Sequence, residues 1–287
     1  MNTKLFILIS CLLLIATSSF AKSRTVKGNG NLVNKEISIK DYDAIEALGG
    51  VTIEYEQSSA SPYLQLTIDE NILPYLDIRV KGKTLSIGFK DESDDYYDDD
   101  DDESIQINNG EVKYRSGLSI SATKYIITTN SETLKDINLV GGCHMNINSK
   151  FKAERFNANI AGSGSINFSK PTDIHKGDFS IAGSGEINLR TFRMTNLNCS
   201  IAGGGEINLN GKADKADYSV AGGGNIYGYN CNVKKAECSV AGGGSIQVYA
   251  TEQLDASTAG GGKIRYKGNP TISEDVVAGG SIKRYEE

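Results

Sequence analysis

The sequence is dominated by a glycine-rich segment that recurs at nearly regular intervals through the second half of the chain. The segment Ala161–Phe168 (AGSGSINF) returns from Ala182 as AGSGEINL and from Ala202 as AGGGEINL. Together with a degenerate first copy and a shortened last one, the copies begin at Val140, Ala161, Ala182, Ala202, Ala221, Ala241, Ala259 and Ala278. Such regularity predicts a fold built from stacked repeats.

Each repeat has the pattern of β-strand. In Lys215–Val220, for example, Lys, Asp and Ser alternate with Ala, Tyr and Val, which is the period of a half-buried strand. A propeller blade of four strands needs about 40 residues, so a unit of about 20 residues suits one coil of a β-helix better. We therefore predict an all-β protein whose residues 128–287 form a single-stranded, right-handed parallel β-helix (solenoid), since right-handed crossovers are the rule.

The glycines and isoleucines of the repeat have predicted structural roles. Glycine adopts positive φ without steric cost, so the first glycine of each copy is predicted to make a sharp corner. These corner residues are Gly162, Gly183, Gly203, Gly222, Gly242, Gly260 and Gly279. One isoleucine per coil is predicted to stack on its equivalent in the next coil, and its burial contributes about 1.5–3 kcal/mol. This core column is Ile166, Ile187, Ile207, Ile226, Ile246 and Ile264.

The chain before the repeats is also predicted to be β-rich. Strand-like alternation occurs in Tyr63–Ile68, Asp77–Val80 and Thr84–Phe89. A tight turn is predicted at Lys81–Lys83 and one helical turn within Asn71–Leu76, while Leu48-Gly49-Gly50 resembles the later corners. An open coil would expose unpaired strand edges. Residues 22–127 are therefore predicted to form an N-terminal β cap that is continuous with the solenoid.

The segment Met1–Ala21 has the pattern of a signal peptide. Lys4 precedes the apolar run Leu5–Ile15, and Ser19-Phe20-Ala21 offers the small residues of a cleavage site. Lipoprotein processing at Cys11 is disfavoured because the apolar run continues beyond it. The mature chain contains no further apolar run of about 18 residues, so no transmembrane span is expected. These features predict export to the periplasm or cell surface.

An acidic insertion interrupts the predicted cap. Residues 91–103 contain ten Asp and Glu residues. Such a run repels itself and is usually a solvated loop. It lacks the interrupting glycine and spaced ligands of a calcium loop, so loose cation binding is the alternative interpretation.

Charge and cysteine content exclude several classes of protein. The formal net charge is −6 at pH 7, which disfavours a general nucleic-acid binder. The mature cysteines are Cys143, Cys199, Cys231 and Cys238, and their spacing does not suggest a zinc site. Cys199 and Cys238 share a register two coils apart, about 9.6 Å, which exceeds the reach of a disulfide. Free thiols are therefore predicted.

One outward column of the predicted solenoid is a candidate binding site. Four residues before each corner stand Asp136, Asn157, Asp178, Asn198, Asp217, Glu237, Asp255 and Glu274. Asp178, Asp217, Glu237 and Asp255 are the candidates to bind a ligand or cation. Alternatively, the column is neutralised by a second one, two residues earlier, of Arg155, Lys176, Asn196, Lys215, Lys235 and Gln253. A further outward column, Asn167, Asn188 and Asn208, is explained by amide stacking as well as by a ligand.

No catalytic constellation emerges from the sequence. His144 and His175 have no third partner and are interpreted as surface residues. No Ser/His/Asp arrangement, phosphate loop or metal-binding cluster is present, so neither a metal nor another cofactor is expected. The alternative is a polysaccharide-active β-helix enzyme that uses paired outward carboxylates.

Several motifs together resemble a known family. Besides the corners, they are Asp41–Ile45 (DYDAI), Asp69–Leu73 (DENIL) and Tyr266–Pro270 (YKGNP). In combination they resemble the exported bacterial family of putative autotransporter adhesins with a "head GIN" domain, over about residues 27–285. The chain departs from that family in its long acidic insertion and in having Ala where Ser commonly opens the corner.

This resemblance implies a β-helix-like fold and a periplasmic or surface location, with no catalytic residues to carry over. The expected function is that of a non-enzymatic exported binding or scaffold module of the cell envelope. Candidate partners are a cell-surface glycan or an envelope protein.

Overall fold

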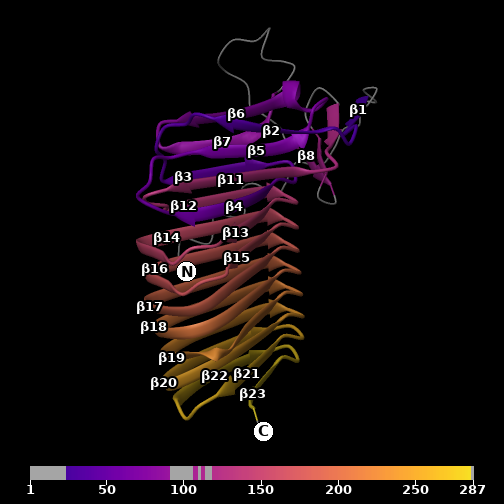
Figure 1. The fold of residues 1–287 in the computed structure, drawn as a ribbon. Helices are drawn as coiled ribbons and strands as arrows, with labels where there is room; N and C mark the ends of the chain where they lie inside the picture. The colour runs from indigo at the N-terminus through magenta and orange to yellow at the C-terminus, as the bar shows by residue number, and fades with distance from the viewer. Residues whose placement is uncertain (1–23, 91–105, 109–110, 114–117, 286–287) are drawn as a thin grey trace.

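The computed structural model describes residues 24–90, 106–108, 111–113 and 118–285. It shows a β-solenoid of about 7 turns, roughly 20 residues apart, and so confirms the predicted fold class. The coils stack along one axis, with additional strands over the N-terminal end (Figure 1). The predicted signal peptide, residues 1–21, and the acidic segment 91–103 lie outside the described residues.

The strands of the N-terminal region are short. They are β1 (Arg24–Lys27), β2 (Leu32–Ile37), β3 (Ala44–Leu48), β4 (Thr52–Gln57), β5 (Leu64–Asp69), β6 (Leu76–Lys81), β7 (Thr84–Phe89), β8 (Gln106–Asn108), β9 (Glu111–Lys113), β10 (Leu118–Ser121) and β11 (Tyr125–Ser131). One 3-10 turn, η2 (Leu73–Tyr75), falls within the predicted helical turn.

The repeat region has longer strands, because several of them bend through a corner without interruption. They are β12 (Asp136–Gly141), β13 (His144–Ile147), β14 (Phe151–Gly162), β15 (Ser165–Phe168), β16 (Thr172–Gly183), β17 (Glu186–Gly203), β18 (Glu206–Gly222), β19 (Asn225–Gly242), β20 (Ser245–Ala259), β21 (Lys263–Lys267), β22 (Thr271–Val277) and β23 (Ser281–Arg284).

Parallel pairing places equivalent residues of successive coils side by side. Ile187 pairs with Ile207, and Ile207 pairs with Ile226. All six isoleucines of the column are 0% exposed. The column continues upward through Met145 and Ile53, which the repeat pattern did not mark. The core is therefore a line of stacked side chains rather than a single cluster.

The three glycines of a corner differ in the space that each would leave for a Cβ atom. Gly203 has φ +127°, and a Cβ there would lie 2.5 Å from the carbonyl oxygen of Gly183. A Cβ on Gly205 would lie 2.7 Å from Cγ2 of Ile181. A Cβ on Gly204 would have no neighbour closer than 3.8 Å, and serine takes this middle place at Ser184. In this corner, therefore, only Gly203 and Gly205 are sterically required.

The N-terminal end of the solenoid is closed by antiparallel strands. On one side the order runs β13, β4, β11, β5, β2, and on the other β12, β3, β7, β6. Strands β3 and β4 form a coil around Gly49 and Gly50, both with positive φ, within the segment predicted to be the cap. This coil stacks directly on the β12–β13 coil, although a long stretch of chain separates them.

In the last coil the predicted register is wrong by one residue. Val277 pairs with Ala259, so Ala278 takes the place of the first corner glycine, with φ +59°. Gly279 therefore falls at the middle corner position, one place later than predicted. For the same reason Ser273, not Glu274, pairs with Asp255 and continues the carboxylate column. The last repeat reaches its corner one residue sooner than its Ala-Gly-Gly sequence indicates. Gly279 and Glu274 are therefore each one position later than the pattern predicts.

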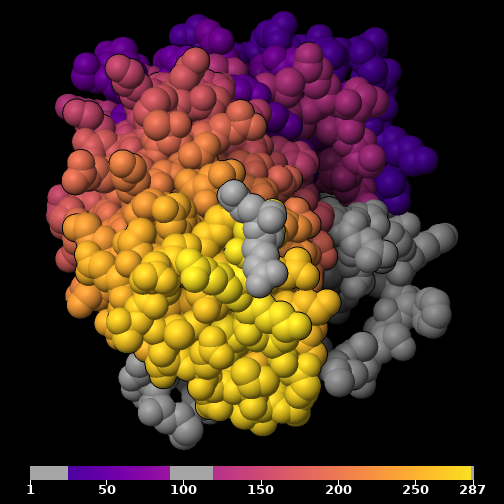
Figure 2. Space-filling model, turned by 90° about the horizontal axis from the view of Figure 1, so that it is seen from below, coloured from indigo at the N-terminus to yellow at the C-terminus, as the bar shows by residue number. Residues whose placement is uncertain are grey.

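The C-terminal end shows no antiparallel cover among the described residues. Strands β22 and β23 pair only with the coil before them, and Val276 and Val277 are exposed. Figure 2 looks at this end of the molecule. Glu274 pairs with the buried Ala256, so it occupies an inward position of the strand. Inward-pointing charge is one of the devices that keep an exposed strand edge from pairing with other chains.

Candidate functional site

The predicted carboxylate column exists, but its partners are amides rather than lysines. Asp178 pairs in register with Asn198, and Asp217 with Glu237. Asn198 donates a hydrogen bond to Asp178, and Nε2 of Gln253 donates to Asp255 at 2.9 Å. Within the described part of the chain, no ion pair joins this column to the lysine column, so the predicted neutralisation is wrong. Asn198 lies one coil away from Asp178, at the strand spacing, and Gln253 lies two residues before Asp255 on the same strand. Lys215 and Lys235, by contrast, are exposed to solvent.

Asp217 and Glu237 are the least compensated carboxylates of this column. Neither makes a side-chain hydrogen bond or ion pair with another described residue. Partial burial, and then the charge of Glu237, raise the pKa of Asp217. Like charges directly opposite each other destabilise a sheet. The pair therefore has a small unfavourable effect on folding, and it does not line either depression described below.

The coils differ from one another mainly at the corner opposite the glycines. We call this region the variable corner; it comprises residues 190–194, 210–213, 229–233 and 249–252. Thr191, within β17, is an extra residue that has no register partner in β18, and its φ is +52°. Tyr229, Asn230 and Cys231 have no register partners in β20. Bulges of this kind often lie beside functional sites, so the repeat is interrupted where a site could form.

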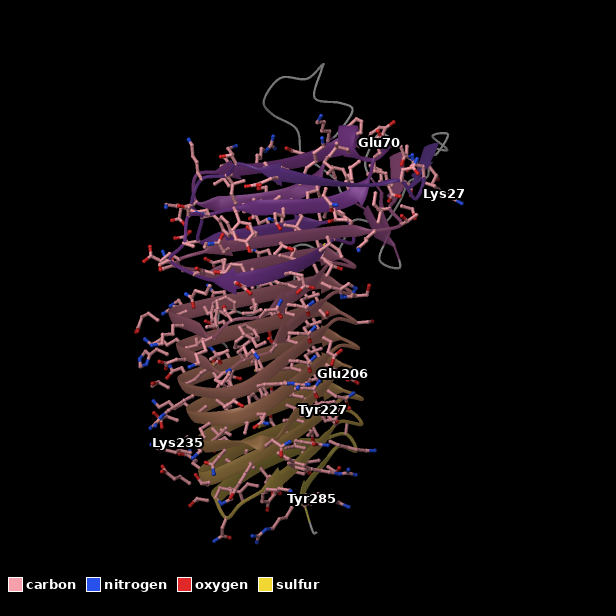
Figure 3. The ribbon with its side chains drawn as sticks, in the orientation of Figure 1. Lys27, Glu70, Glu206, Tyr227, Lys235 and Tyr285 are labelled. Atoms are coloured by element: carbon pink, nitrogen blue, oxygen red, sulfur yellow. The ribbon has the colours of Figure 1, made fainter. Side chains whose placement is uncertain are left out.

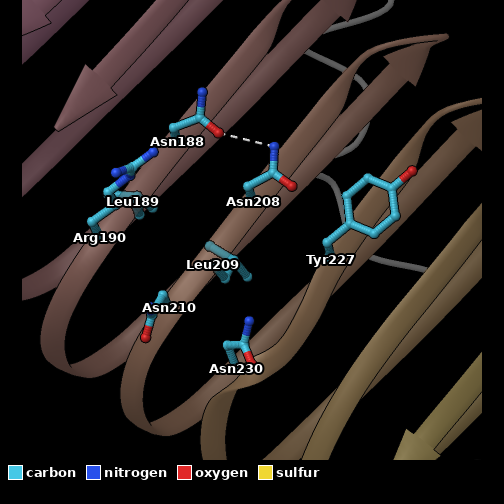
Figure 4. A pocket seen from close by; sticks show the side chains of 8 residues that line it. All are labelled: Asn188, Leu189, Arg190, Asn208, Leu209, Asn210, Tyr227 and Asn230. Atoms are coloured by element: carbon cyan, nitrogen blue, oxygen red, sulfur yellow. Dashed lines mark hydrogen bonds between the residues drawn. The ribbon is translucent and has the colours of Figure 1, made fainter. Parts of the chain in front are cut away.

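Two shallow depressions lie at the variable corner and on the strands that lead into it. The first, of about 350 Å³, is lined by asparagines of three coils together with Arg190 and Tyr227. The second, of about 440 Å³, adds Lys212, Tyr229 and Tyr249. Both are open to solvent, and they share Asn210 and Asn230. We call the two together the asparagine groove; the first is drawn in Figure 4.

The asparagines of the regular ladder, two of which (Asn188 and Asn208) line the groove, are hydrogen-bonded to one another. Nδ2 of Asn167 donates to Asn146 at 3.3 Å, Asn188 to Asn167 at 2.7 Å, and Asn208 to Asn188 at 2.9 Å. These bonds confirm the predicted amide stacking. The ladder ends at Asn208, because Tyr227 occupies the next position of the column.

At the variable corner, by contrast, the amide and cationic side chains of the groove have no side-chain partner in the described chain. Asn210, Asn230 and Asn232 make no side-chain hydrogen bond to any described residue. Arg190 and Lys212 likewise form no ion pair within the described ranges. Each of these side chains keeps its hydrogen-bonding capacity for water or a ligand.

Tyrosine rings flank the free amides. Burial, and then Glu206, raise the pKa of Tyr227, so its hydroxyl is neutral and can both donate and accept. Tyr229 packs against Tyr285, with ring centroids 4.9 Å apart, and Lys267 Nζ lies 5.0 Å from the centre of the Tyr229 ring. The buried Tyr229 hydroxyl has no hydrogen-bond partner in the described chain, which is uncommon in folded proteins.

A glycine in the strand leaves room for a buried tyrosine in the core beneath the groove. Gly228 follows Tyr227, and a Cβ there would lie 2.6 Å from the carbonyl oxygen of Gln247 and 3.4 Å from the Tyr218 ring. Tyr218 is fully buried, and its hydroxyl donates to Sγ of Cys231 at 3.7 Å. The interior behind the groove is therefore filled by protein, and the groove remains a surface feature.

The cysteines of the predicted mature chain are buried in the core, and each histidine contacts a neighbouring hydroxyl group. All four cysteines of the predicted mature chain are free and buried, as predicted, and Tyr218 pairs with both Cys199 and Cys238. Burial raises the pKa of Cys231 to about 11, so its thiol is unreactive. His144 contacts Ser165 at 2.9 Å, and His175 contacts Thr195 at 3.0 Å. The described residues contain no group of three or more His, Cys, Asp and Glu side chains that could hold a metal ion.

The groove cannot be recognised from the repeat pattern, because several of its residues do not recur from coil to coil. Asn188 and Asn208 were recognised as a column, but Arg190, Asn210 and Asn230 were not. The available signal was the unequal length of successive repeats, which requires extra residues somewhere in the longer coils. Figure 3 shows Tyr227 near Glu206, while Lys235 of the lysine column stands at the opposite edge.

Known proteins share both the sequence pattern and the fold. The family described as putative auto-transporter adhesin, head GIN domain, matches residues 41–270. A solved structure of a putative lipid binding protein from Parabacteroides distasonis is 39% identical with TM-score 0.82, covering 92% of this chain and 100% of that chain. A putative adhesin from Parabacteroides merdae is 31% identical with TM-score 0.79, covering 91% and 99%. No curated protein matches the chain.

Proposed function

Since the chain belongs to the putative auto-transporter adhesin, head GIN domain family, we propose that it is an exported, non-enzymatic binding module of the cell envelope that holds its ligand in the asparagine groove. The observation that carries this proposal is the contrast between two sets of asparagines. Those of the regular ladder bond to each other, whereas those at the variable corner have no partner among the described residues. Polar side chains left free in a concave surface are the usual means of orienting a ligand.

Several features support a binding role over catalysis. A glycan-cleaving enzyme needs two carboxyl groups on either side of the scissile bond. The adjacent pair Asp217 and Glu237 lies outside the groove, and no described Asp or Glu lines it. The stacked core also makes the groove rigid, which suits recognition of a ligand without a conformational change.

Export is supported by the sequence and by the family. The predicted signal peptide ends at Ala21, and the relatives include proteins described as putative adhesins. No described segment forms a helix long and apolar enough to cross a bilayer. Cell fractionation, combined with protease treatment of intact cells, tests this part of the proposal. Recovery of the full-length chain in the cytoplasm would contradict it.

Binding by the groove is tested with the purified mature chain and envelope fractions from the organism that produces it. Replacing Tyr227 or Asn230 by alanine removes a groove side chain, so we expect at least a tenfold loss of affinity in a pull-down titration. Gln247→Ala is the matched control, because Gln247 follows Tyr227 in the same outward column but does not line the groove. Equal binding by all three variants and the wild type, or turnover of an envelope polysaccharide, would overturn the proposal.

A further inference from the structure

We propose that the ligand of the asparagine groove is an acidic glycan, a sugar chain whose units carry a carboxylate or sulfate group, lying along the solenoid axis. This inference rests on the proposed binding function and adds the chemical class of the ligand. It follows from four features of the groove: its charge, its amides, its tyrosine ring and its spacing.

The charge of the groove opposes that of the whole chain. The protein has a formal net charge of −6, yet the ionisable side chains that line the groove, apart from tyrosines, are Arg190 and Lys212. Neither is neutralised by another described residue, so both can pair with an anion. Guanidinium groups match the geometry of carboxylate and sulfate oxygens in two parallel hydrogen bonds.

The uncharged lining suits hydroxyl groups. Each asparagine amide offers two donors and an acceptor, and each sugar hydroxyl is also both donor and acceptor. Asn210, Asn230 and Asn232 lie on two neighbouring coils and have no partner in the described chain. A ligand with many hydroxyls would satisfy them, whereas an apolar ligand would bury them unpaired, which is unfavourable.

The Tyr227 ring supplies an apolar surface among these amides. Figure 4 shows this ring on the same face as Asn208 and Asn230. A tyrosine combines a flat apolar face with a polar tip, and the C–H face of a pyranose ring can pack against such a surface.

The geometry of the solenoid matches an extended sugar chain. Successive coils are about 4.8 Å apart, which is close to the length of one linked hexose unit. The column Asn188, Asn208 and Tyr227 therefore presents one side chain to each successive sugar. Arg190, Asn210 and Asn230 form a second, parallel row. The two rows would contact the same sugars from either side.

An acyl chain does not fit the same surface. Lipid tails need an enclosed apolar cavity, but the groove is open and its apolar floor consists of Leu189, Leu209 and Phe192, whose side chains are almost wholly buried. Tyr218 fills the interior behind Gly228. The groove could take the polar part of a lipid, but not its tails.

Titration calorimetry of the full mature chain tests the ligand class with defined polymers. The probes are polygalacturonate, its carboxyl-reduced neutral form, dextran sulfate, dextran, polyglutamate and phospholipid vesicles. We expect binding to polygalacturonate or dextran sulfate, with at least a tenfold loss for the matching neutral polymer and no comparable binding of polyglutamate. Arg190→Gln and Lys212→Gln should each weaken binding severalfold, whereas Lys235→Gln, on the opposite edge, should not.

The outcomes separate this inference from the proposed function. Preference for neutral glycans, equal binding of polyglutamate, or binding only to phospholipid vesicles would overturn the acidic-glycan assignment. If none of the polymers binds while Tyr227→Ala still abolishes capture of envelope fractions, the ligand class is wrong and the groove remains the binding site. If Tyr227→Ala leaves envelope capture intact, the proposed function itself fails.

Discussion

The two corners of each coil are built on opposite principles. At the glycine corner every coil follows the same path, and backbone hydrogen bonds link each corner to the next, as from Gly204 N to Gly183 O at 2.9 Å. At the variable corner the coils differ in length, and residues such as Thr191 and Tyr229 fall outside the ladder. Repetition therefore gives this molecule its rigidity, and local departure from repetition gives it a candidate binding surface.

The sharpest test of this contrast is an insertion, which should have the largest effect. One alanine inserted after Gly204 shifts the following strand by one residue and turns Ile207 and Leu209 outward. We expect a loss of at least about 3 kcal/mol, since each apolar side chain contributes about 1.5–3 kcal/mol. The same insertion after Asn230, where the coil already bulges, should cost under about 1 kcal/mol. Denaturant midpoints measure both effects, and similar losses would show that the two corners are equally constrained.

A smaller effect is expected within the glycine corner itself. Gly203→Ala places a Cβ at a positive φ and against the carbonyl oxygen of Gly183, so it should destabilise the protein by about 1–3 kcal/mol. Gly204→Ala brings its Cβ no closer than 3.8 Å to a neighbour and should leave stability unchanged or raise it by up to about 1 kcal/mol. Thermal unfolding of the two variants distinguishes them. A comparable loss at Gly204 would mean that the corner needs glycine for a reason other than steric space.

The smallest effect concerns the carboxylate column, between the two corners. The pKa of Asp217 is raised in the folded state, so protonation of this carboxyl group stabilises the fold. That stabilisation is lost as the pH rises through the folded-state pKa. Asp217→Asn should therefore stabilise the protein at pH 7, by no more than about 1 kcal/mol, because it removes the repulsion from Glu237. The gain should vanish near pH 3, because Asp217, with its raised pKa, is protonated there.

Asp178→Asn provides the comparison for this prediction. Asp178 accepts a hydrogen bond from Asn198, so its replacement should bring no gain at pH 7. The unfolding midpoints of both variants and the wild type, measured at pH 7 and near pH 3, test this difference. Loss of stability in the Asp217 variant at pH 7 would indicate that this carboxylate has a favourable partner.

Much of the fold could be predicted because side-chain direction in a strand is a local property. The alternation in Lys215–Val220 specifies which residues face inward, and the repeat length specifies which residues stack. The isoleucine column, the cysteine register and the amide ladder all follow from these two periods. Where the last repeat changes its length, the same reasoning misplaces Glu274 by one residue.

The groove could not be predicted in this way, because it depends on how coils of different length lie against one another. Arg190, Asn210 and Asn230 share a register only after the extra residues have been placed outside the ladder. Pairing between coils decides that placement, as it decides that the β3–β4 coil stacks on the distant β12–β13 coil. The sequence alone determined the coil, its inward and outward faces and its glycine corner, since these need only local periodicity. The tertiary structure decided which polar side chains bond to each other and which remain free, since that depends on neighbours contributed by other coils.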